Sequence, residues 1–232
     1  MTGALLMIAM VVVVVRVLPA DDGGAYEPSL RARLRDAFEQ FRRQRFWSVL
    51  LFTGALYASP GFQILFYYYQ RDQLGLSDQM IGLLIGLNCF GGMLGAVAYG
   101  LWGRRFRLSH NIVGGIGLCC VVAFAYLAYR SVGTALVIEP LAGFCLVLGY
   151  LPIHELSARA SPPKHEAFAF AVLLSVGNAA IALSDVLGTK IAESLSLGLN
   201  EMIFVNVATM AASLCLLLLV PSSLLGKESD GG

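Results

Sequence analysis

Long apolar stretches separated by short polar turns run through most of the 232-residue chain. A helix needs about 20 mostly apolar residues to cross the hydrocarbon core of a bilayer. Stretches near that length, bounded by charged residues, Pro or Gly, predict membrane spans at approximately 2–18, 46–69, 78–102, 111–129, 132–154, 166–193 and 201–221. The pattern therefore predicts an all-α membrane protein with seven transmembrane helices.

The spans divide the chain into a first helix, a linker, a bundle and a tail. These parts are residues 1–18, 19–45, 46–226, which holds six spans, and 227–232. In the linker, "EPSLRARLRDAFEQFRRQRF" places Leu and Phe at helical spacing among arginines, which is typical of an amphipathic helix lying on lipid headgroups. The first span lacks the basic start and the small-residue cleavage site of a signal peptide, so we interpret it as retained.

The composition supports a membrane protein, because 57% of the residues are apolar and only 13% are charged. The cysteines all lie in apolar segments without metal-ligand spacing, and His110 and His165 lie in loops. The glycines of 82–103 belong to a membrane span and not to a phosphate loop, and no nucleophile has a base at usable spacing. We therefore expect no enzyme, no cofactor and no metal site. A retinal-binding protein is disfavoured because 201–221 contains no lysine.

Basic residues are distributed unequally between the two sides of the predicted spans. One side holds Arg16, Arg31, Arg33, Arg35, Arg42, Arg43, Arg45, Arg104, Arg105, Arg107, Arg159, Lys164 and Lys227. The other side holds only Arg71, Arg130 and Lys190. Because loops rich in Lys and Arg stay in the cytoplasm, we expect the N-terminus outside the cell and the C-terminus in the cytoplasm. The expected location is the plasma (inner) membrane. The linker arginines are not expected to bind nucleic acid, since they are tethered between two spans.

Two spans carry features that affect helix packing. In the second, Pro60 and Gly61 predict a helix irregularity. The tyrosines before Arg71 are expected at the membrane interface. Ser77, after this span, is expected to cap the next helix. The third contains small residues whose spacing lets another helix approach closely, namely Gly82, Gly86, Gly91, Gly92, Gly95, Gly100 and Gly103. This spacing fits either static packing or a sliding contact in a protein that changes shape.

Polar residues from several spans are expected at a similar depth in the membrane. They are Gln63, Asn88, Glu139 and Asp185. An ionisable group in a span costs about 2.5 to 3.5 kcal/mol unless it faces water or a partner, so these residues predict a shared cavity. Burial there would make either acid a candidate proton carrier. The alternatives are ion pairs, of Glu139 with Arg130 and of Asp185 with Lys190.

The fourth and fifth spans differ in their polar content. The fourth has no charged or amide residue between Ile112 and Tyr129, so it is expected to face lipid. The fifth ends at His154 and Glu155 on its cytoplasmic side. These two residues fit either a gate or simple polarity at the interface.

Three stretches of the chain resemble the folate-biopterin transporter family, a branch of the major facilitator superfamily. "SPGFQ" at 59–63, the aromatic run after it, "LGLS" at 74–77 and Ile81-Gly82 are similar to the seventh-helix region of that family. "LPIHELSARASPPKHEAFAFAVLLSVGN" at 151–178 resembles its passage from the tenth to the eleventh helix. "YGLWGRRFRLS" at 99–109 is similar to the basic turn of the superfamily, with the acidic residue of that turn replaced around Trp102.

The resemblance implies both a fold and a function. The first span would be helix six of a twelve-helix transporter, and the other spans would form its C-terminal six-helix bundle. Helices one to five would then be missing, or supplied by a second subunit. The implied function is a secondary active transporter, or half of one, that moves a small organic solute such as a folate or pterin by alternating access, with proton coupling as one option. The alternative is a non-transporting scaffold or partner subunit derived from a truncated transporter.

The same stretches extend the set of candidate site residues. Candidates for the solute or ion cavity are Gln63, Asn88, Glu139, Ser175, Asn178 and Asp185. Candidates for a cytoplasmic gate are Arg104, Arg105, His154, Glu155 and Arg159. The expected partners are the lipid bilayer, a small-molecule solute and a missing N-terminal half or second subunit.

Overall fold

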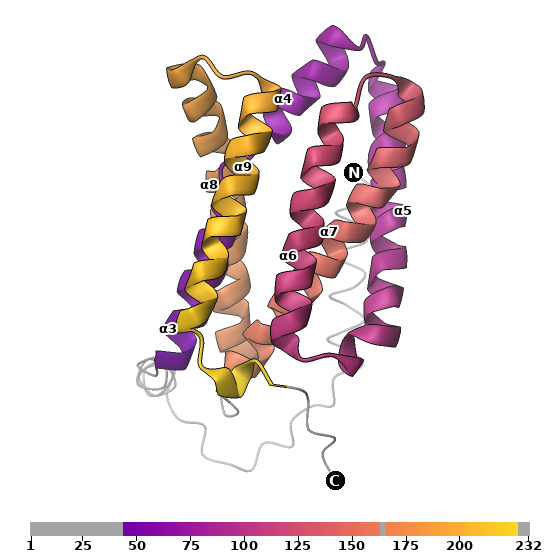
Figure 1. Ribbon diagram of the computed structural model, residues 1–232. Coiled ribbons are helices and arrows are strands. Elements are labelled where there is room, and N and C mark those ends of the chain that lie inside the picture. Colours follow the sequence, from indigo (N-terminus) through magenta and orange to yellow (C-terminus); the bar gives the residue numbers. More distant parts are fainter. Residues whose placement is uncertain (1–43, 163–165, 227–232) are drawn as a thin grey trace, which may run out of the picture. The chain divides into compact units, whose positions relative to one another are not determined.

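All the secondary structure that the computed structural model describes is helical (Figure 1). The described residues are 44–162 and 166–226, except for the side chains of Gln44 and Arg104. The predicted first span, the amphipathic linker helix and the tail lie outside these residues. For the described part, the prediction of an all-α protein is confirmed.

Five helices of the described part are long and apolar enough to cross a membrane. They are α5 (Asp78–Trp102), α6 (Leu108–Ala125), α7 (Val132–Ala160), α8 (Glu166–Leu195) and α9 (Leu199–Ser213). Short 3-10 turns extend α6 to Ala128 and α9 to Leu219, so that both elements reach the length of a span.

The predicted span at 46–69 forms two helices in place of one. α3 (Gln44–Tyr57) and α4 (Gln63–Tyr68) are separated by residues 58–62, and a π-helical turn, Tyr69–Gln73, follows α4. Pro60 causes the break, because it has no N–H to donate and disfavours a helical conformation in the residue before it. The irregularity predicted at this point is confirmed, and it interrupts the helix completely.

The fifth span is longer than predicted, because α7 continues to Ala160. The residues from 155 onward, expected in a loop, are therefore helical as far as that point, and His154, Glu155 and Arg159 lie on one helix. A helix does not have to end where the hydrocarbon ends, so apolar content alone placed this boundary too early.

Glycines on one face of α5 allow its close packing against α7. A Cβ at Gly95 would lie 2.6 Å from the carbonyl oxygen of Phe144, and a Cβ at Gly91 would overlap the carbonyl group of Pro140. Nothing lies within 4 Å of a Cβ built at Gly82, Gly86 or Gly100. The predicted close approach of a second helix is confirmed for the glycines that face α7.

The prediction that the fourth span faces lipid is wrong for one side of α6, whereas Val113, Leu118 and Val121 on the same helix are 48%, 41% and 67% exposed. α6 packs against both α7 and α9 (Figure 1), and Leu108, Ile112 and Ile116 are at most 1% exposed. A Cβ at Gly115 would lie 2.7 Å from the carbonyl oxygen of Leu148 in α7. An apolar span can pack against other apolar helices as readily as against lipid, so the lack of polar residues does not distinguish these surroundings.

Buried apolar side chains form two clusters in the bundle. One cluster includes Phe52, Ile116 and Leu156, and the other includes Phe66 and Met202. Residues from both clusters line one cavity beside the break between α3 and α4. This cavity lies where the two clusters meet.

Candidate functional site

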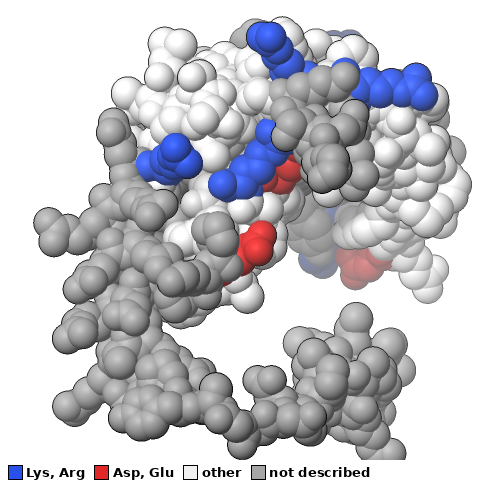
Figure 2. All heavy atoms as spheres, turned by 90° about the horizontal axis from the view of Figure 1, so that it is seen from below, with Lys and Arg blue, Asp and Glu red and all other residues white. Residues whose placement is uncertain are grey.

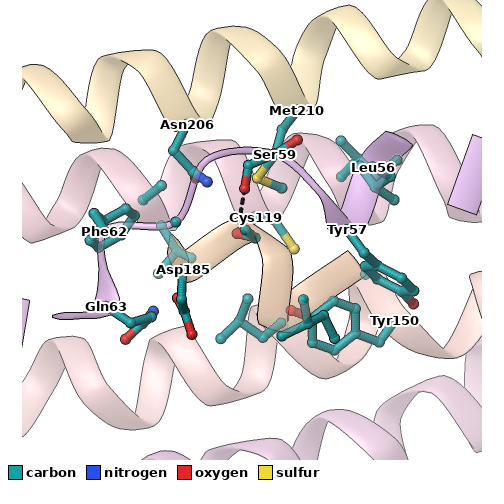
Figure 3. A pocket seen from close by; sticks show the side chains of 18 of the residues that line it. Leu56, Tyr57, Ser59, Phe62, Gln63, Cys119, Tyr150, Asp185, Asn206 and Met210 are labelled. Carbon is teal, nitrogen blue, oxygen red and sulfur yellow. Dashed lines mark hydrogen bonds between the residues drawn. The ribbon is translucent and has the colours of Figure 1, made fainter. Parts of the chain in front are cut away.

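The cavity beside the helix break has a volume of about 180 Å³. Most of its wall is apolar, and its side-chain polar groups come from α3, the break, α4, α7, α8 and α9. They belong to Tyr57, Ser59, Gln63, Tyr150, Ser184, Asp185 and Asn206, and Tyr126 in the turn after α6 adds another hydroxyl. Figure 3 shows Gln63 and Asp185 at one end of the cavity and Tyr57 and Tyr150 at the other.

The broken backbone at 58–62 is held by side chains and backbone of α8 and α9. The N–H of Gly61 donates to the carbonyl oxygen of Ser184 at 3.0 Å, and the Ser184 hydroxyl donates to the carbonyl oxygen of Ser59 at 2.5 Å. The Nδ2 of Asn206 donates to the carbonyl oxygen of Pro60 at 2.9 Å. Irregular backbone at membrane depth needs such partners, and its presence beside a cavity is typical of substrate sites in transporters.

Asp185 follows Ser184 directly and presents its carboxylate to this cavity. Among the described residues it forms no ion pair, so the alternative of a pair with Lys190 is not observed. The side-chain amide of Gln63 likewise has no hydrogen-bond partner within 44–162 and 166–226. Both groups are therefore available to a bound molecule.

Asn88 and Glu139 lie in a second polar cluster, between α5 and α7. The Nδ2 of Asn88 donates to Oε2 of Glu139 at 3.1 Å and to its backbone carbonyl oxygen at 3.2 Å. Glu139 is only 6% exposed, and the hydroxyl groups of Tyr126 and Tyr129 also interact with its carboxyl group. It forms no ion pair with Arg130 or with another described residue.

The second cluster extends to the π-helical turn after α4. The Nε2 of Gln70 donates to the hydroxyl of Tyr129 at 2.6 Å, and the hydroxyl of Tyr69 donates to the carbonyl oxygen of Tyr129 at 2.7 Å. Tyr126 belongs to the wall of the cavity as well as to this cluster. The structure thus brings Gln63 and Asp185 together, and it joins Asn88 and Glu139 separately, with Tyr126 between the two groups.

A smaller cavity of about 120 Å³ lies between α3, α7 and α8. Its polar lining includes Thr53, His154, Ser157 and Asn178. Ser175, the remaining cavity candidate, is exposed and does not line either cavity. His154, expected at a gate, therefore lies beside Asn178 in the wall of this second cavity.

Glu155 and Arg159 connect three elements at the end of α7. Glu155 accepts hydrogen bonds from the Tyr99 hydroxyl at 2.5 Å and from Nη2 of Arg159 at 2.5 Å. The Nη1 of Arg159 donates to the carbonyl oxygens of Leu224, at 3.3 Å, and Gly226, at 2.8 Å. This network links α5 and α7 to the segment that follows α9.

The remaining gate candidates belong to the turn after α5. Arg105 is exposed and makes no ion pair with a described residue, and the side chain of Arg104 lies outside the described part. Figure 2 shows Lys and Arg side chains at several points on this end of the molecule. Arg45 and Arg107 are exposed there too.

Several residues of the site were missed by the sequence analysis. Asn206 carries an amide inside an apolar span, which is the signal that identified Asn88, so it could have been found. Ser184 and Gln70 gave no such signal, because a serine is common in spans and Gln70 stands in a polar turn. Tyr57 and Tyr150 were not separable from ordinary interfacial aromatics.

The sequence of the chain matches a known protein family. The family model described as Major Facilitator Superfamily matches residues 1–185 and 69–230 of the chain. The chain belongs to the major facilitator superfamily. As a member of this superfamily of membrane transporters, it is not an enzyme, which agrees with the sequence analysis.

This member of the major facilitator superfamily is also similar to a protein named folate-biopterin transporter from Synechocystis sp. (strain ATCC 27184 / PCC 6803 / Kazusa). The two are 24% identical over an alignment of 222 positions, and the match covers 88% of the chain and 43% of the relative. The chain thus spans less than half the length of this relative. The resemblance to the folate-biopterin transporters is confirmed as a distant one. No solved structure matches the chain.

Proposed function

We propose that the chain is one half of a secondary active transporter that moves a folate-like or pterin-like solute by alternating access. The observation that carries this proposal is the cavity at the helix break, where Gln63 and Asp185 present polar groups without partners among the described residues. Transporters place their substrate sites beside interrupted helices in this way. Membership of a transporter superfamily supports the same function.

The size of the cavity supports a role as one wall of a larger site. Pockets for small organic ligands enclose about 300–1,000 Å³, and this one has about 180 Å³. A second six-helix unit, on the same polypeptide or on a partner subunit, would face the cavity and complete it. In this superfamily the substrate lies between two such halves.

The solute class is proposed from the relative's name and from the chemistry of the wall. A pterin ring carries neighbouring N–H donors on one edge, and a carboxylate such as that of Asp185 accepts two hydrogen bonds from such an edge. Gln63 offers both a donor and an acceptor beside it. The described wall of the cavity contains no Lys or Arg, so the carboxylates of a folate would need basic groups from the facing unit.

Proton coupling is the second part of the proposal, with Glu139 as the carrier. Its carboxyl group is buried without a cation among the described residues, and Tyr126 lies between it and the solute cavity. A carboxyl group in such a place can bind and release a proton as the solute site opens and closes.

The cytoplasmic C-terminus and the plasma (inner) membrane location are proposed from the unequal distribution of Lys and Arg.

Uptake of tritiated folic acid and tritiated biopterin into reconstituted vesicles tests this function. The chain is assayed alone and with a co-expressed six-helix partner. Asp185→Asn should lower uptake at least about tenfold, because the amide no longer accepts two hydrogen bonds from the solute. Asp78→Asn is the matched control, because Asp78 is exposed in the first turn of α5, and it should retain uptake.

The same assay separates the transporter from the alternative of a non-transporting scaffold. A scaffold would give no uptake of either compound, alone or with the partner, and Asp185→Asn would then have no effect to measure. Uptake that is equal in Asp185→Asn and Asp78→Asn would show that a solute is moved without the proposed cavity.

A further inference from the structure

The two cavities of the site meet at a pair of tyrosines. Tyr57, Tyr150, Ile153 and Ile181 line both the larger and the smaller cavity. Tyr57 is the last residue of α3 before the break, and Tyr150 lies on α7. Their ring centroids are 5.5 Å apart and their planes are inclined by 70°, an edge-to-face contact (Figure 3). The pair therefore forms the partition between the cavities.

The hydroxyl group of Tyr57 is buried and has no hydrogen-bond partner among the described residues. Buried polar groups in proteins are nearly always paired, and an unpaired one costs free energy. The ring that carries it has little freedom, because a Cβ at Gly177 of α8 would lie 3.1 Å from its Cδ2 and Cε2 atoms. The side chain of Tyr57 thus lies at the junction of the two cavities, and its hydroxyl has no protein partner in the described part.

We propose that Tyr57 is a specificity-determining residue, whose hydroxyl group hydrogen-bonds a planar heteroaromatic solute at the junction of the two cavities. This inference rests on the proposed function. The phenol can donate to a ring nitrogen or carbonyl oxygen of the solute, and the ring of Tyr150 offers an aromatic surface beside it. Solutes that lack such an acceptor leave the Tyr57 hydroxyl unpaired and bind more weakly.

The test is Tyr57→Phe in the full chain, with uptake of tritiated biopterin measured over a range of concentrations. The ring and the partition remain, and only the hydroxyl is removed. The KM should rise about tenfold, which is the effect of one lost hydrogen bond, while the maximal rate changes little. Tyr68→Phe is the matched control, because Tyr68 is 56% exposed and lines neither cavity, and its KM should equal that of the wild type.

Thermal unfolding distinguishes this role from a structural one. Because the hydroxyl is unpaired in the protein, Tyr57→Phe should keep or raise the Tm while it weakens uptake. A structural role would lower the Tm together with uptake. Gly177→Ala is a second variant: it keeps the hydroxyl but displaces the ring, and it should also raise the KM for biopterin.

The outcomes separate this inference from the proposed function. If the wild type takes up neither biopterin nor folic acid, the proposed function is wrong and this inference with it. If the wild type takes up biopterin and the KM of Tyr57→Phe equals that of Tyr68→Phe, the transporter stands and the role of Tyr57 is wrong. A raised KM with an unchanged or higher Tm supports the inference.

Discussion

The backbone N–H of Gly61 donates a hydrogen bond to the carbonyl oxygen of Ser184, 3.0 Å away. This bond joins the broken helix to α8 at the residue directly before Asp185. One turn further along α8, a Cβ at Gly188 would overlap the carbonyl group of Gly61. The break and the carboxylate that faces the cavity are therefore held together by backbone contact.

Gly188→Ala should destabilise the protein and abolish uptake. The added methyl group would force α8 away from the break, and overpacking of this kind costs about 1–3 kcal/mol. Gly86→Ala in α5 is the control, because nothing lies within 4 Å of a Cβ there, and alanine favours a helix over glycine by about 0.5–1 kcal/mol. Thermal unfolding of the detergent-solubilised protein measures both. Equal Tm values for the two variants would contradict the contact.

Asn206→Leu should lower stability by about 1–3 kcal/mol, because it leaves the carbonyl oxygen of Pro60 without its side-chain donor. The distance of 2.9 Å between Nδ2 and this oxygen is that of a normal hydrogen bond. Asn200→Leu is the matched control, since Asn200 is exposed in the first turn of the same helix. The two variants are compared by denaturant unfolding. A loss of stability in both, or in neither, would mean that this bond does not hold the break.

The helices were predictable from the sequence, because long apolar stretches have few alternatives in a membrane. The break at Pro60 was predictable for a similar reason, since proline cannot continue a helix without loss. The rise per residue of a helix predicts how deep a polar residue lies in the membrane, and it places Gln63, Asn88, Glu139 and Asp185 in one layer. Depth contains no information about which way each side chain points around its helix.

The packing of α6 shows the same limit. Between Ile112 and Tyr129 its sequence has no charged or amide residue to mark a buried side, yet Ile112 and Ile116 are buried against neighbouring helices. Tyr126 was unremarkable in the sequence, yet it lines the cavity and interacts with Glu139. Such relations depend on helix rotation, which is set by packing and not by hydropathy.

Glu139→Gln should uncouple transport from protons and leave the solute site intact. The amide is similar in shape to the carboxyl group and carries no titratable proton. In vesicles with an imposed pH gradient, the wild type should accumulate biopterin, whereas the variant should only exchange it across the membrane. Glu201→Gln is the control, because Glu201 is exposed at the start of α9 and should remain coupled. Accumulation that still responds to the gradient in Glu139→Gln would exclude this residue as the carrier.

Arg159→Lys should release the segment that follows α9. One ammonium group cannot replace a guanidinium that donates to Glu155 and to the carbonyl oxygens of Leu224 and Gly226 together. Hydrogen exchange of the amides of 222–226 should become about tenfold faster. The amide of Ser109, bonded to Leu225 at 3.3 Å, should follow them.

Arg107→Lys provides the control for this exchange experiment. Arg107 is exposed and makes no ion pair with a described residue, so the same change in side chain should leave exchange unaltered. Slow exchange at 222–226 in Arg159→Lys would show that charge alone, without the forked contacts, holds the segment.

The most direct test of the central claim is whether solute occupies the cavity at the helix break. A cysteine is placed at Ile181, which lines it, or at Leu183 on the same helix, which does not. The two side chains are 42% and 49% exposed, and the native cysteines are replaced in a background that retains uptake. Folic acid should slow the maleimide labelling of Ile181→Cys, with half-maximal protection near the KM for uptake, and leave Leu183→Cys unaffected. Equal labelling of Ile181→Cys with and without saturating folic acid, in vesicles that take it up, would contradict the assignment.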